Sequence, residues 1–512
     1  MGENAMPTWT RLPDGRGAMT LPGDRRYVWL PVGASDAKEE LLCAGKEGVR
    51  WRLMTPSWDA PEAFRYYSAI ETGGGPVTLT GRFPDAFFDA IRTADERPGP
   101  ADTHPAIHFA AENGWINDPN GLVAQDGVFH LYFQHNPVDM VWENMSWGHA
   151  VSRDLLHWTQ LDNAMYPDAE GTMFSGSGLE NRQGALGLPS NALLFFYTCA
   201  GDTSAWSRGK HATQRMAYSL DGGRTLVKGT GPIVEKIRGF NRDPKVYWYA
   251  PKKLYYMALY LEEDEFAILN STDLTDFQVT QRLTMPGSGE CPDLRAIPQE
   301  GGGERWMLME ADGHYLLGDF DGSRFIAASP LQCAYCTALP YAAQTVSGPE
   351  DRVILIPWMR TLNRGCAYTG MMGLPREMTL ARVNGEDRLR LRPVREYWNA
   401  RRPTERLTYA FDQHRAVEAE VSLEGAARAE ITVGQIAIVY DRTAGRLTVG
   451  GETVDFPAGL PGLRMLIDKG ILEISSSDDL WLAPFEADET MEQGEIAVRG
   501  EGVKVDFYEI PG

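Results

Sequence analysis

The sequence contains little cysteine and no long hydrophobic run. Its six cysteines are scattered over 512 residues, and no second Cys or His pair completes a zinc site with Cys333 and Cys336. We therefore expect free thiols that mostly pack in cores. The longest apolar stretch, around residues 192–199, is far shorter than a membrane span, and residues 1–7 lack the basic and apolar segments of a signal peptide. These absences predict a soluble cytoplasmic protein, or a secreted one if a signal has been trimmed.

Basic charge is also scarce. The chain has 49 Lys and Arg against 70 Asp and Glu, a formal charge of −21, and no segregated basic patch. Such a chain would repel a phosphate backbone, so a nucleic-acid partner is not expected. The 14 Trp and 20 Tyr beside many carboxylates suit a neutral polyhydroxylated ligand. Aromatic faces can stack on sugar C–H surfaces while carboxylates accept hydrogen bonds from hydroxyl groups.

The composition favours β-structure in more than one domain. A chain of 512 residues is too long for one compact core, and 53 Gly with 32 Pro favour short strands and tight turns over long helices. Residues 1–103 show short alternating stretches that predict a small N-terminal β-rich domain, ending in a Pro/Gly linker at 97–102. Residues 404–512 again alternate and predict a C-terminal β-sandwich, with 397–403 as the connector.

Between these parts, residues 104–395 contain an internal repeat. Strongly apolar strands recur about 50 to 65 residues apart, at 128–133, 192–198, 254–260, 305–309 and 353–358. A second element, an Asp followed four residues later by an aromatic residue, recurs at Asp154, Asp273 and Asp321, with a looser copy at Asp221. Units of this length with several strands each predict a five-bladed β-propeller, because one blade cannot bury both of its faces alone.

The stretch from Gly114 to Gly121 places an acid in a sequence typical of a turn. Pro119 biases Asp118 towards an extended backbone, and Asn120 and Gly121 tolerate positive φ. We therefore expect a rigid turn that holds the Asp118 carboxylate near the mouth of the strand at 128. Asp118 is the candidate nucleophile.

Two further acids occupy a similar place in the repeat. Asp118, Asp243 and Glu290 precede the apolar strand of their own unit by 10, 11 and 15 residues, and each is followed by proline directly or one residue later. Equivalent points of successive blades converge on the propeller axis, so the three acids should share one funnel. Converging carboxylates push one pKa upwards, as an acid/base and nucleophile pair requires, and this pattern points to glycoside hydrolysis.

At these residues the chain resembles glycoside hydrolase family 32, the invertases, levanases and inulinases that act on β-fructofuranosides. The resemblance is carried by Trp115-Ile116-Asn117-Asp118-Pro119-Asn120-Gly121, Arg242-Asp243-Pro244 and Glu290-Cys291-Pro292-Asp293, and continues over roughly residues 104–395. It implies the family's fold, a five-bladed propeller followed by a β-sandwich. Two parts depart from the family pattern: the N-terminal domain, absent from the commonest members, and the run 466–475, which matches the usual sandwich signature only loosely.

The resemblance further implies a retaining double displacement. Asp118 would attack the anomeric carbon, Glu290 would act as acid and then base, and Asp243 would stabilise the transition state, with about 5 to 5.5 Å between the Asp118 and Glu290 carboxyl groups. Matching positions suggest six fructose contacts: Asn117, Gln134, Trp142, Ser175, Arg242 and Trp358. Neither a metal nor a cofactor is required.

These features favour an exo-acting hydrolase of levan, inulin and fructo-oligosaccharides, with sucrose as an expected further substrate. An invertase or sucrose-6-phosphate hydrolase, a fructosyltransferase and a non-catalytic sugar-binding propeller stay open as alternatives. Trp142, Trp358 and Phe174 have an alternative interpretation as core aromatics. Oligomeric state and the preferred linkage are not indicated by the sequence.

Overall fold

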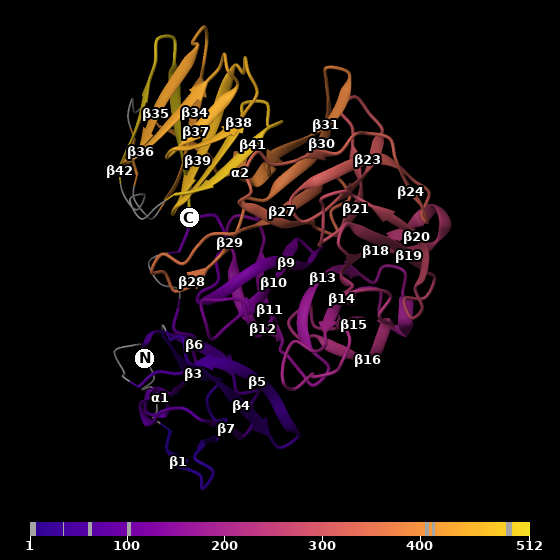
Figure 1. Cartoon of the computed structure of the whole chain (residues 1–512), viewed down its shortest axis with the longest axis vertical. Helices are drawn as coiled ribbons and strands as arrows, with labels where there is room; N and C mark the ends of the chain where they lie inside the picture. The colour runs from indigo at the N-terminus through magenta and orange to yellow at the C-terminus, as the bar shows by residue number, and fades with distance from the viewer. Residues whose placement is uncertain are drawn as a thin grey trace.

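The computed structural model describes residues 7–33, 35–59, 64–99, 104–404, 409–411, 415–487 and 494–512. Within these ranges the chain is almost entirely β-structure, arranged as an N-terminal unit, a ring of five sheets and a C-terminal pair of sheets (Figure 1). The predicted all-β class, with a five-bladed propeller and a sandwich, is confirmed. The boundary predicted at residue 103 and part of the linker before it lie outside the described residues, as do residues 1–6.

The N-terminal unit consists of two antiparallel sheets that share one core. The sheets have the orders β1-β2-β7-β4-β5 and β6-β3-β8. Both contribute to one cluster of buried side chains, which includes Leu30, Leu41 and Trp51. Its elements are β1 (Trp9–Arg11), β2 (Gly17–Leu21), β3 (Tyr27–Gly33), β4 (Lys38–Gly45), β5 (Gly48–Pro56), β6 (Phe64–Glu71), β7 (Val77–Gly81), α1 (Asp85–Ala90) and β8 (Arg92–Ala94).

The ring consists of five blades, each built on four antiparallel strands. From the central channel outwards they are β9 (Gly114–Gln125), β10 (Val128–Asn136), β11 (Ser146–Ser152) and β12 (Thr159–Met165) in blade 1; β13 (Thr172–Glu180), β14 (Leu193–Ala200), β15 (Thr213–Ser219) and β16 (Val227–Val234) in blade 2; β17 (Arg242–Tyr249), β18 (Leu254–Glu262), β19 (Glu265–Ser271) and β20 (Gln278–Thr284) in blade 3; β21 (Asp293–Pro298), β22 (Glu304–Met309), β23 (His314–Phe320) and β24 (Phe325–Ala327) in blade 4; and β26 (Pro340–Thr345), β27 (Val353–Met359), β30 (Arg376–Val383) and β31 (Glu386–Pro393) in blade 5. Three two-residue strands, β25 (Gln332–Cys333), β28 (Tyr368–Thr369) and β29 (Met371–Met372), extend blades 4, 1 and 5.

The five apolar strands expected from the sequence are β10, β14, β18, β22 and β27, the second strand of every blade. Neighbouring strands flank each of them on both edges and neighbouring blades cover both faces. All eight residues of β14 are buried, for example. Double-sided burial explains why these strands are apolar at successive positions instead of alternating.

The recurring Asp residues lie in the turns between the third and fourth strands of blades 1 to 4. Each carboxylate accepts hydrogen bonds from backbone N–H groups of its own turn, such as Thr275 N to Asp273 Oδ1 at 2.9 Å and Arg324 N to Asp321 Oδ1 at 2.8 Å. Such Asx turns reverse the chain within a few residues. The repeat is therefore a structural feature of the blades.

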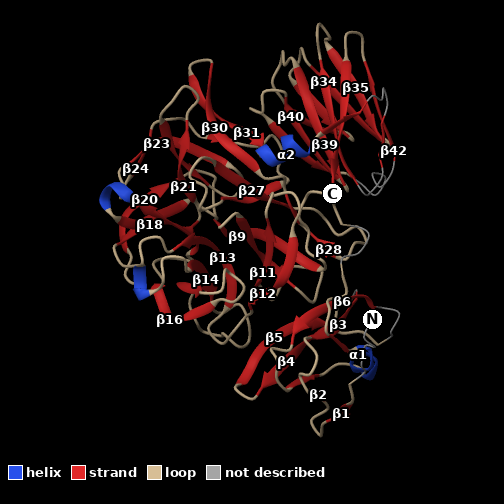
Figure 2. Ribbon diagram, turned by 180° about the vertical axis from the view of Figure 1, so that it is seen from behind, coloured by secondary structure: helices blue, strands red, loops and turns tan. Residues whose placement is uncertain are grey.

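The C-terminal part is a sandwich of two six-stranded sheets, with the orders β32-β43-β34-β39-β40-β41 and β33-β42-β35-β36-β37-β38. Helix α2 (Arg395–Ala400) precedes it. The strands are β32 (Arg402–Thr404), β33 (Tyr409–Phe411), β34 (Arg415–Ser422), β35 (Arg428–Val433), β36 (Ile436–Asp441), β37 (Arg446–Val449), β38 (Glu452–Asp455), β39 (Gly462–Asp468), β40 (Ile471–Ser476), β41 (Leu482–Glu486), β42 (Gly494–Arg499) and β43 (Lys504–Pro511). Seen from behind, α2 lies between blade 5 and the sandwich (Figure 2).

A buried polar network joins the sandwich to the propeller. Asp468 and Glu473, from the hairpin β39–β40, contact the two ring nitrogens of His108 at 2.8 and 3.2 Å. Arg376 of β30 also pairs with Glu473, and Asp468 accepts hydrogen bonds from three successive backbone N–H groups at 106–108. The run that departs from the family signature therefore holds the two domains together.

Among the described residues, no helix is long and apolar enough to cross a membrane.

Candidate active site

A cavity of about 300 Å³ lies at one mouth of the propeller channel. It is lined by Asn117, Asp118, Gln134, Trp142, Phe174, Ser175, Arg242, Asp243, Glu290, Tyr341 and Trp358. All three predicted catalytic carboxylates and all six predicted sugar contacts are thus brought together. Phe174, for which packing was the alternative, lines the wall, and so does Tyr341, for which no role was predicted.

The backbone around Asp118 differs from the expectation. The residues of the predicted turn instead belong to strand β9. The strand contains a β-bulge at this point, where Asn117 and Asp118 together oppose Gln134 of β10. A bulge inserts one extra residue and redirects side chains. Pro119 is tolerated within the strand because β9 is the innermost strand. Its other edge pairs with β28 at residues 114–115 and with Ser347 at residues 122–124, so no ladder N–H is needed there at Pro119.

The same device recurs around the ring. Phe174 and Ser175 oppose Thr198 in blade 2, Asp243 and Pro244 oppose Leu259 in blade 3, and Ala342 and Ala343 oppose Pro357 in blade 5. Blade 2 also requires glycine at position 176, because a Cβ there would lie 1.9 Å from the Phe196 carbonyl oxygen. The bulges of blades 1 to 3 thus aim side chains at the cavity, whereas the bulge of blade 5 buries Ala342 against Cys291.

Blade 4 uses another irregularity. Strand β21 pairs regularly with β22, and Glu290 lies three residues before it, not in a bulge. Glu290 and Cys291 have φ of +64° and +44°, and Asp243 in blade 3 has φ of +64°. A left-handed backbone at non-glycine residues costs about 1 to 3 kcal/mol and is characteristic of functional sites. The three candidate acids therefore do not share one backbone conformation, although they converge.

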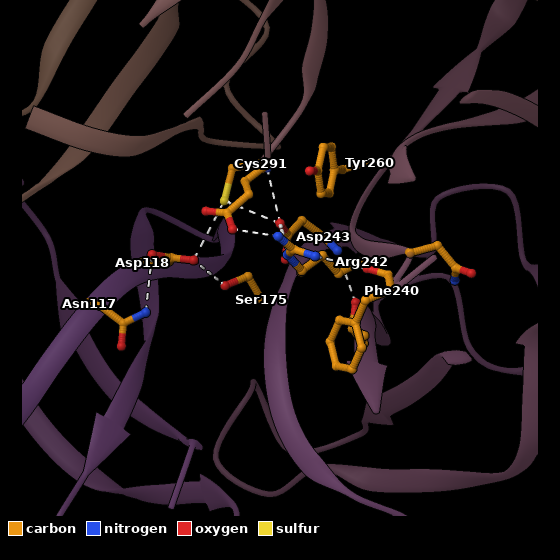
Figure 3. A network of polar contacts seen from close by, with 12 residues as sticks. Asn117, Asp118, Ser175, Phe240, Arg242, Asp243, Tyr260 and Cys291 are labelled. Atoms are coloured by element: carbon orange, nitrogen blue, oxygen red, sulfur yellow. Dashed lines mark hydrogen bonds and ion pairs between the residues drawn. The ribbon is translucent and has the colours of Figure 1, made fainter. Parts of the chain in front are cut away.

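Asp118 is partly buried and accepts hydrogen bonds from three side chains. Ser175 Oγ donates to Oδ2 at 2.5 Å, Asn117 Nδ2 donates to Oδ1 at 3.1 Å, and the Cys291 thiol lies 3.5 Å from Oδ2 (Figure 3). Burial raises the pKa of Asp118, and the nearby Glu290 adds to this, while the Ser175, Asn117 and Cys291 donors oppose it. These donors favour the ionised form that a nucleophile requires.

Asp243 lies beside a guanidinium yet has a raised pKa. Its Oδ2 accepts a hydrogen bond from the backbone N–H of Cys291 at 3.1 Å and lies 3.8 Å from Arg242 Nε (Figure 3). Burial raises the pKa of Asp243 to about 7; Arg242 lowers it, and the charges of Glu290 and Asp118 raise it. Asp118 and Asp243 thus both have raised pKa values, where the sequence predicted one.

Both carboxylate oxygens of Glu290 are engaged by donors. Arg242 Nη2 donates to Oε1 at 2.5 Å, and the Tyr341 hydroxyl donates to Oε2 at 2.5 Å. Arg242 itself lies over the Tyr260 ring, 4.5 Å from its centroid. Burial and then the neighbouring Glu290 raise the pKa of Tyr341, so this hydroxyl stays a donor at neutral pH. Glu290 is held in one orientation at the cavity edge.

Residues opposite the bulges link neighbouring blades. Gln134 Nε2 donates to the Met173 carbonyl of blade 2 at 2.8 Å, and Thr198 Oγ1 accepts from the Asp243 N–H of blade 3 at 2.9 Å. These bonds fix the relative positions of the three innermost strands that supply Asp118, Ser175 and Asp243. Gln134, predicted as a sugar contact, therefore also has a structural hydrogen bond.

Aromatic side chains form the walls. Trp142 packs edge to face on Phe174 with centroids 5.9 Å apart, and Trp358 packs edge to face on Trp115 at 5.8 Å. Trp358 is 8% exposed and Trp142 51% exposed. Both line the cavity, so neither is simply a core residue. The buried Trp358 Nε1 has no hydrogen-bond partner among the described residues.

A second cavity, of about 520 Å³, adjoins the first and shares Glu290 and Tyr341 with it. Its other lining residues are Tyr260, Glu263, Asp264, Gly287, Ser288, Gly289 and Asp312. Four carboxylates and no Lys or Arg occur among these described lining residues. The lining of this cavity is therefore acidic, although Arg360 pairs with Asp312 and Arg242 with Glu290. No group of three His, Cys, Asp or Glu residues suited to a metal ion is found in the described part of the chain.

The channel below the carboxylates is occupied by side chains. Lys245 of β17 is 3% exposed, and its Nζ lies 3.2 Å from Asp293 Oδ2 and donates to the Thr345 carbonyl at 2.7 Å. Tyr247 and Gln344 pack in the same place. These buried side chains close the cavity at this end.

Comparison with known proteins gives consistent results. The family model described as "Glycosyl hydrolases family 32 N-terminal domain" matches residues 108–393. A levanase of Bacillus subtilis is 32% identical over 58% of this chain and 47% of its own length. An extracellular exo-inulinase of Meyerozyma guilliermondii is 31% identical over 55% of this chain and 60% of its own length. The chain thus aligns with roughly half of each of these relatives.

Solved structures show the same fold. An exo-inulinase from Aspergillus awamori superposes with a TM-score of 0.71 and 21% identity, covering 81% of this chain and 99% of that one. A glycoside hydrolase family 32 structure from Bifidobacterium adolescentis superposes with a TM-score of 0.67 and 19% identity, covering 97% of this chain and 99% of that one. The second match extends over the N-terminal unit as well as the propeller and sandwich.

Proposed function

Since the chain belongs to glycoside hydrolase family 32, we propose that it is a retaining, exo-acting β-fructosidase that releases terminal fructose from levan, inulin and fructo-oligosaccharides, with sucrose as a further substrate. The observation that carries this proposal is the convergence of Asp118, Asp243 and Glu290, with their hydrogen-bond donors, in one cavity that is closed at its inner end. The levanase and exo-inulinase relatives support the same substrate class.

In the proposed reaction Asp118 attacks the anomeric C2 of fructose. The bond from C2 to the leaving oxygen breaks as Glu290 transfers its proton to that oxygen, and a fructosyl ester of Asp118 forms. Water, deprotonated by Glu290, then attacks C2 and releases Asp118 and fructose. Asp243 hydrogen-bonds sugar hydroxyls, and these bonds strengthen as positive charge develops on the ring. No metal or cofactor takes part.

The closed end of the cavity supports exo attack. Lys245 and Asp293 occupy the channel below the carboxylates, so a polysaccharide cannot thread through it, and this favours a chain end as the part that reaches Asp118. A volume of about 300 Å³ suits a single sugar ring with its hydroxyl groups. Trp142 and Phe174 offer apolar faces to the ring's C–H surface, and Arg242, Asn117 and Ser175 offer donors.

The acidic cavity beside Glu290 supports a neutral leaving group. A leaving oxygen protonated by Glu290 must lie next to this carboxyl, and Glu263, Asp264 and Asp312 line the space beyond it. A phosphorylated glucose there would meet repulsive charge without a lining Lys or Arg. This weighs against sucrose-6-phosphate as the preferred substrate, the alternative that the sequence left open.

Product analysis tests the proposal. Purified protein is incubated with levan, inulin, sucrose and sucrose-6-phosphate, and products are separated by anion-exchange chromatography. We expect free fructose as the first product from both fructans, activity on sucrose and little on its phosphate. Longer oligomers as first products would contradict exo attack, and products longer than the substrate would indicate transfer to a sugar acceptor.

Asp118→Asn, with Asp126→Asn in the exposed β9–β10 turn as the matched control, should abolish release while retaining binding. Sugar binding without turnover by the wild type would indicate the non-catalytic propeller.

A further inference from the structure

Residues 137–145 connect β10 to β11 of blade 1, and the tip of this loop carries Trp142 at the mouth of the cavity. The tip is exposed, with Val141 at 47% and Trp142 at 51%, whereas Val138 is 0% and Asn144 8% exposed. The loop is thus buried at both ends and open only where it meets the cavity.

The N-terminal unit holds these buried ends. Val138 belongs to the hydrophobic core of that unit, among side chains such as Leu53 and Trp58. Lys38, the first residue of β4, places its Nζ 2.7 Å from Asp139 Oδ2 and 2.8 Å from Glu143 Oε2. One ammonium group therefore joins residues on the two sides of the tip.

Asn144 makes a second connection to the same unit. Its side-chain oxygen accepts from the backbone N–H of Met54 and its amide nitrogen donates to the Met54 carbonyl, both at 2.8 Å. Met54 lies in β5, the edge strand of the five-stranded sheet. The carboxamide thus pairs with this edge as another strand would, and it satisfies backbone groups that an open edge leaves exposed.

The propeller contacts the tip itself, where Phe174 packs edge to face on Trp142 with ring centroids 5.9 Å apart. Thr369 Oγ1 donates to the Met140 carbonyl at 2.8 Å, and Asn136 Nδ2 donates to the Val141 carbonyl at 2.9 Å. These bonds fix the backbone beside Trp142. The ion pairs of Lys38 determine how far Asp139 and Glu143, and hence the two sides of the tip, stand apart.

We propose that the N-terminal unit positions the sugar-binding Trp142 from outside the propeller, and that Lys38 is the positioning residue. This inference rests on the proposed function. With Lys38 in place the indole is presented to substrate in one orientation, so little conformational entropy is lost on binding. Without it the loop samples other conformations and binding weakens. The reacting carboxylates, on other elements, keep their geometry, so the chemical step is spared.

Kinetics on sucrose and a fructo-oligosaccharide test the proposal with full-length protein. Lys38→Met, which keeps the aliphatic stem, should raise KM about fivefold while kcat stays within about twofold, because the loss falls on binding. Lys46→Met is the matched control, since Lys46 lies in the exposed turn of the same β4–β5 hairpin. It should leave both constants unchanged. An unchanged KM in Lys38→Met, or an equal effect of Lys46→Met, would overturn the proposal.

A double-mutant cycle shows whether Lys38 acts through Trp142. If it does, Lys38→Met should change KM hardly at all once Trp142→Ala is present. A KM effect that persists in the Trp142→Ala background would refute the positioning role. Hydrogen exchange of the peptide 137–145 should be faster in Lys38→Met than in Lys46→Met. This measurement needs no turnover, so it tests the positioning role separately from the proposed function. Equal exchange rates would refute the positioning role. A wild type that hydrolyses no fructoside would refute the proposed function alone.

Discussion

Asp118 and Asp243 share one neighbour, because the Cys291 thiol lies 3.5 Å from Oδ2 of Asp118 and 3.6 Å from Oδ2 of Asp243. Cys291 is 2% exposed. Burial, followed by the surrounding carboxylates, raises the pKa of this thiol well above its usual value, so it stays a neutral donor and does not add a third charge between the acids. The residue after the candidate acid/base thus contributes to the environment of the other two acids.

Replacing Cys291 should therefore change the pH dependence of activity. The thiol is one of the groups that lower the pKa of Asp118, so Cys291→Ala should raise that pKa further. Asp118 must be ionised to attack, and the acidic limb of kcat/KM should move to higher pH. Cys291→Ser restores a donor and should move the limb back. Identical limbs in the two variants, measured by pH–rate profiles, would contradict this role.

Asp243→Asn should stabilise the folded protein at neutral pH while inactivating it. The pKa of Asp243 is raised to about 7, above the ordinary value of 3.8, so the protonated carboxyl favours the native state below pH 4 and this contribution is lost as pH rises towards 7. At pH 8 the wild type therefore contains a buried, unfavourable charge that Asn lacks. We expect a Tm gain of several degrees at pH 8 that shrinks at pH 4, measured by calorimetry. An equal gain at both pH values would be inconsistent with this origin.

Glu473→Gln should weaken the attachment of the sandwich. Burial raises the pKa of Glu473, but Arg376 and His108 outweigh it and hold the pKa at about 2, so its contribution to stability is present above pH 4.5 and is lost as pH falls towards 2. Burial lowers the pKa of His108, but Asp468 and Glu473 outweigh it and raise the value to about 9. The contribution of His108 is therefore complete below pH 6.5 and is lost as pH rises through 9.

The variant should consequently lose about 3 to 5 kcal/mol of unfolding free energy, the usual cost of breaking a buried ion pair. The loss should be largest between pH 4.5 and 6.5, where both groups contribute. Glu452→Gln, on an exposed position of β38, provides the control. Denaturant unfolding at pH 5.5 and 9.5 measures the difference, and a loss that does not depend on pH would speak against the network.

Neutralising the acidic cavity should relax selection against phosphorylated substrate. Asp264 and Asp312 line this cavity but touch neither Asp118 nor Asp243 among the contacts described. Asp264→Asn with Asp312→Asn should raise kcat/KM for sucrose-6-phosphate about tenfold relative to sucrose, because removal of repulsive charge acts on the phosphate alone. An unchanged ratio would place the leaving group elsewhere.

The sequence predicted the scaffold and the site membership well, for identifiable reasons. The second strands of the blades are buried on both faces, so their apolar runs stand out without any knowledge of the partners. Asp118, Asp243 and Glu290 occur at similar distances before those strands, and convergence follows from the ring. The placement of Asp118 in a turn was wrong, because Pro119, Asn120 and Gly121 equally suit a bulged strand whose inner edge lies open.

Long-range contacts could not be predicted. Tyr341 is 51 residues from Glu290, and Lys38 is 105 residues from Glu143, and no local pattern relates either pair. Whether a charged side chain pairs across domains depends on their packing, which single-sequence periodicity does not specify. The roles assigned to the site residues stay predictions for the experiments above.

The recurring bulge has a consequence for the redesign of this propeller. Blade 5 makes the same irregularity as blades 1 to 3 but places Ala342 and Ala343 there, both 0% exposed, with Ala342 packed against Cys291. The backbone thus provides a further inward-facing position whose side chain is only a methyl group. A larger functional side chain could be introduced there without rebuilding the ring, provided that Cys291 is replaced at the same time by a smaller residue that leaves room for it.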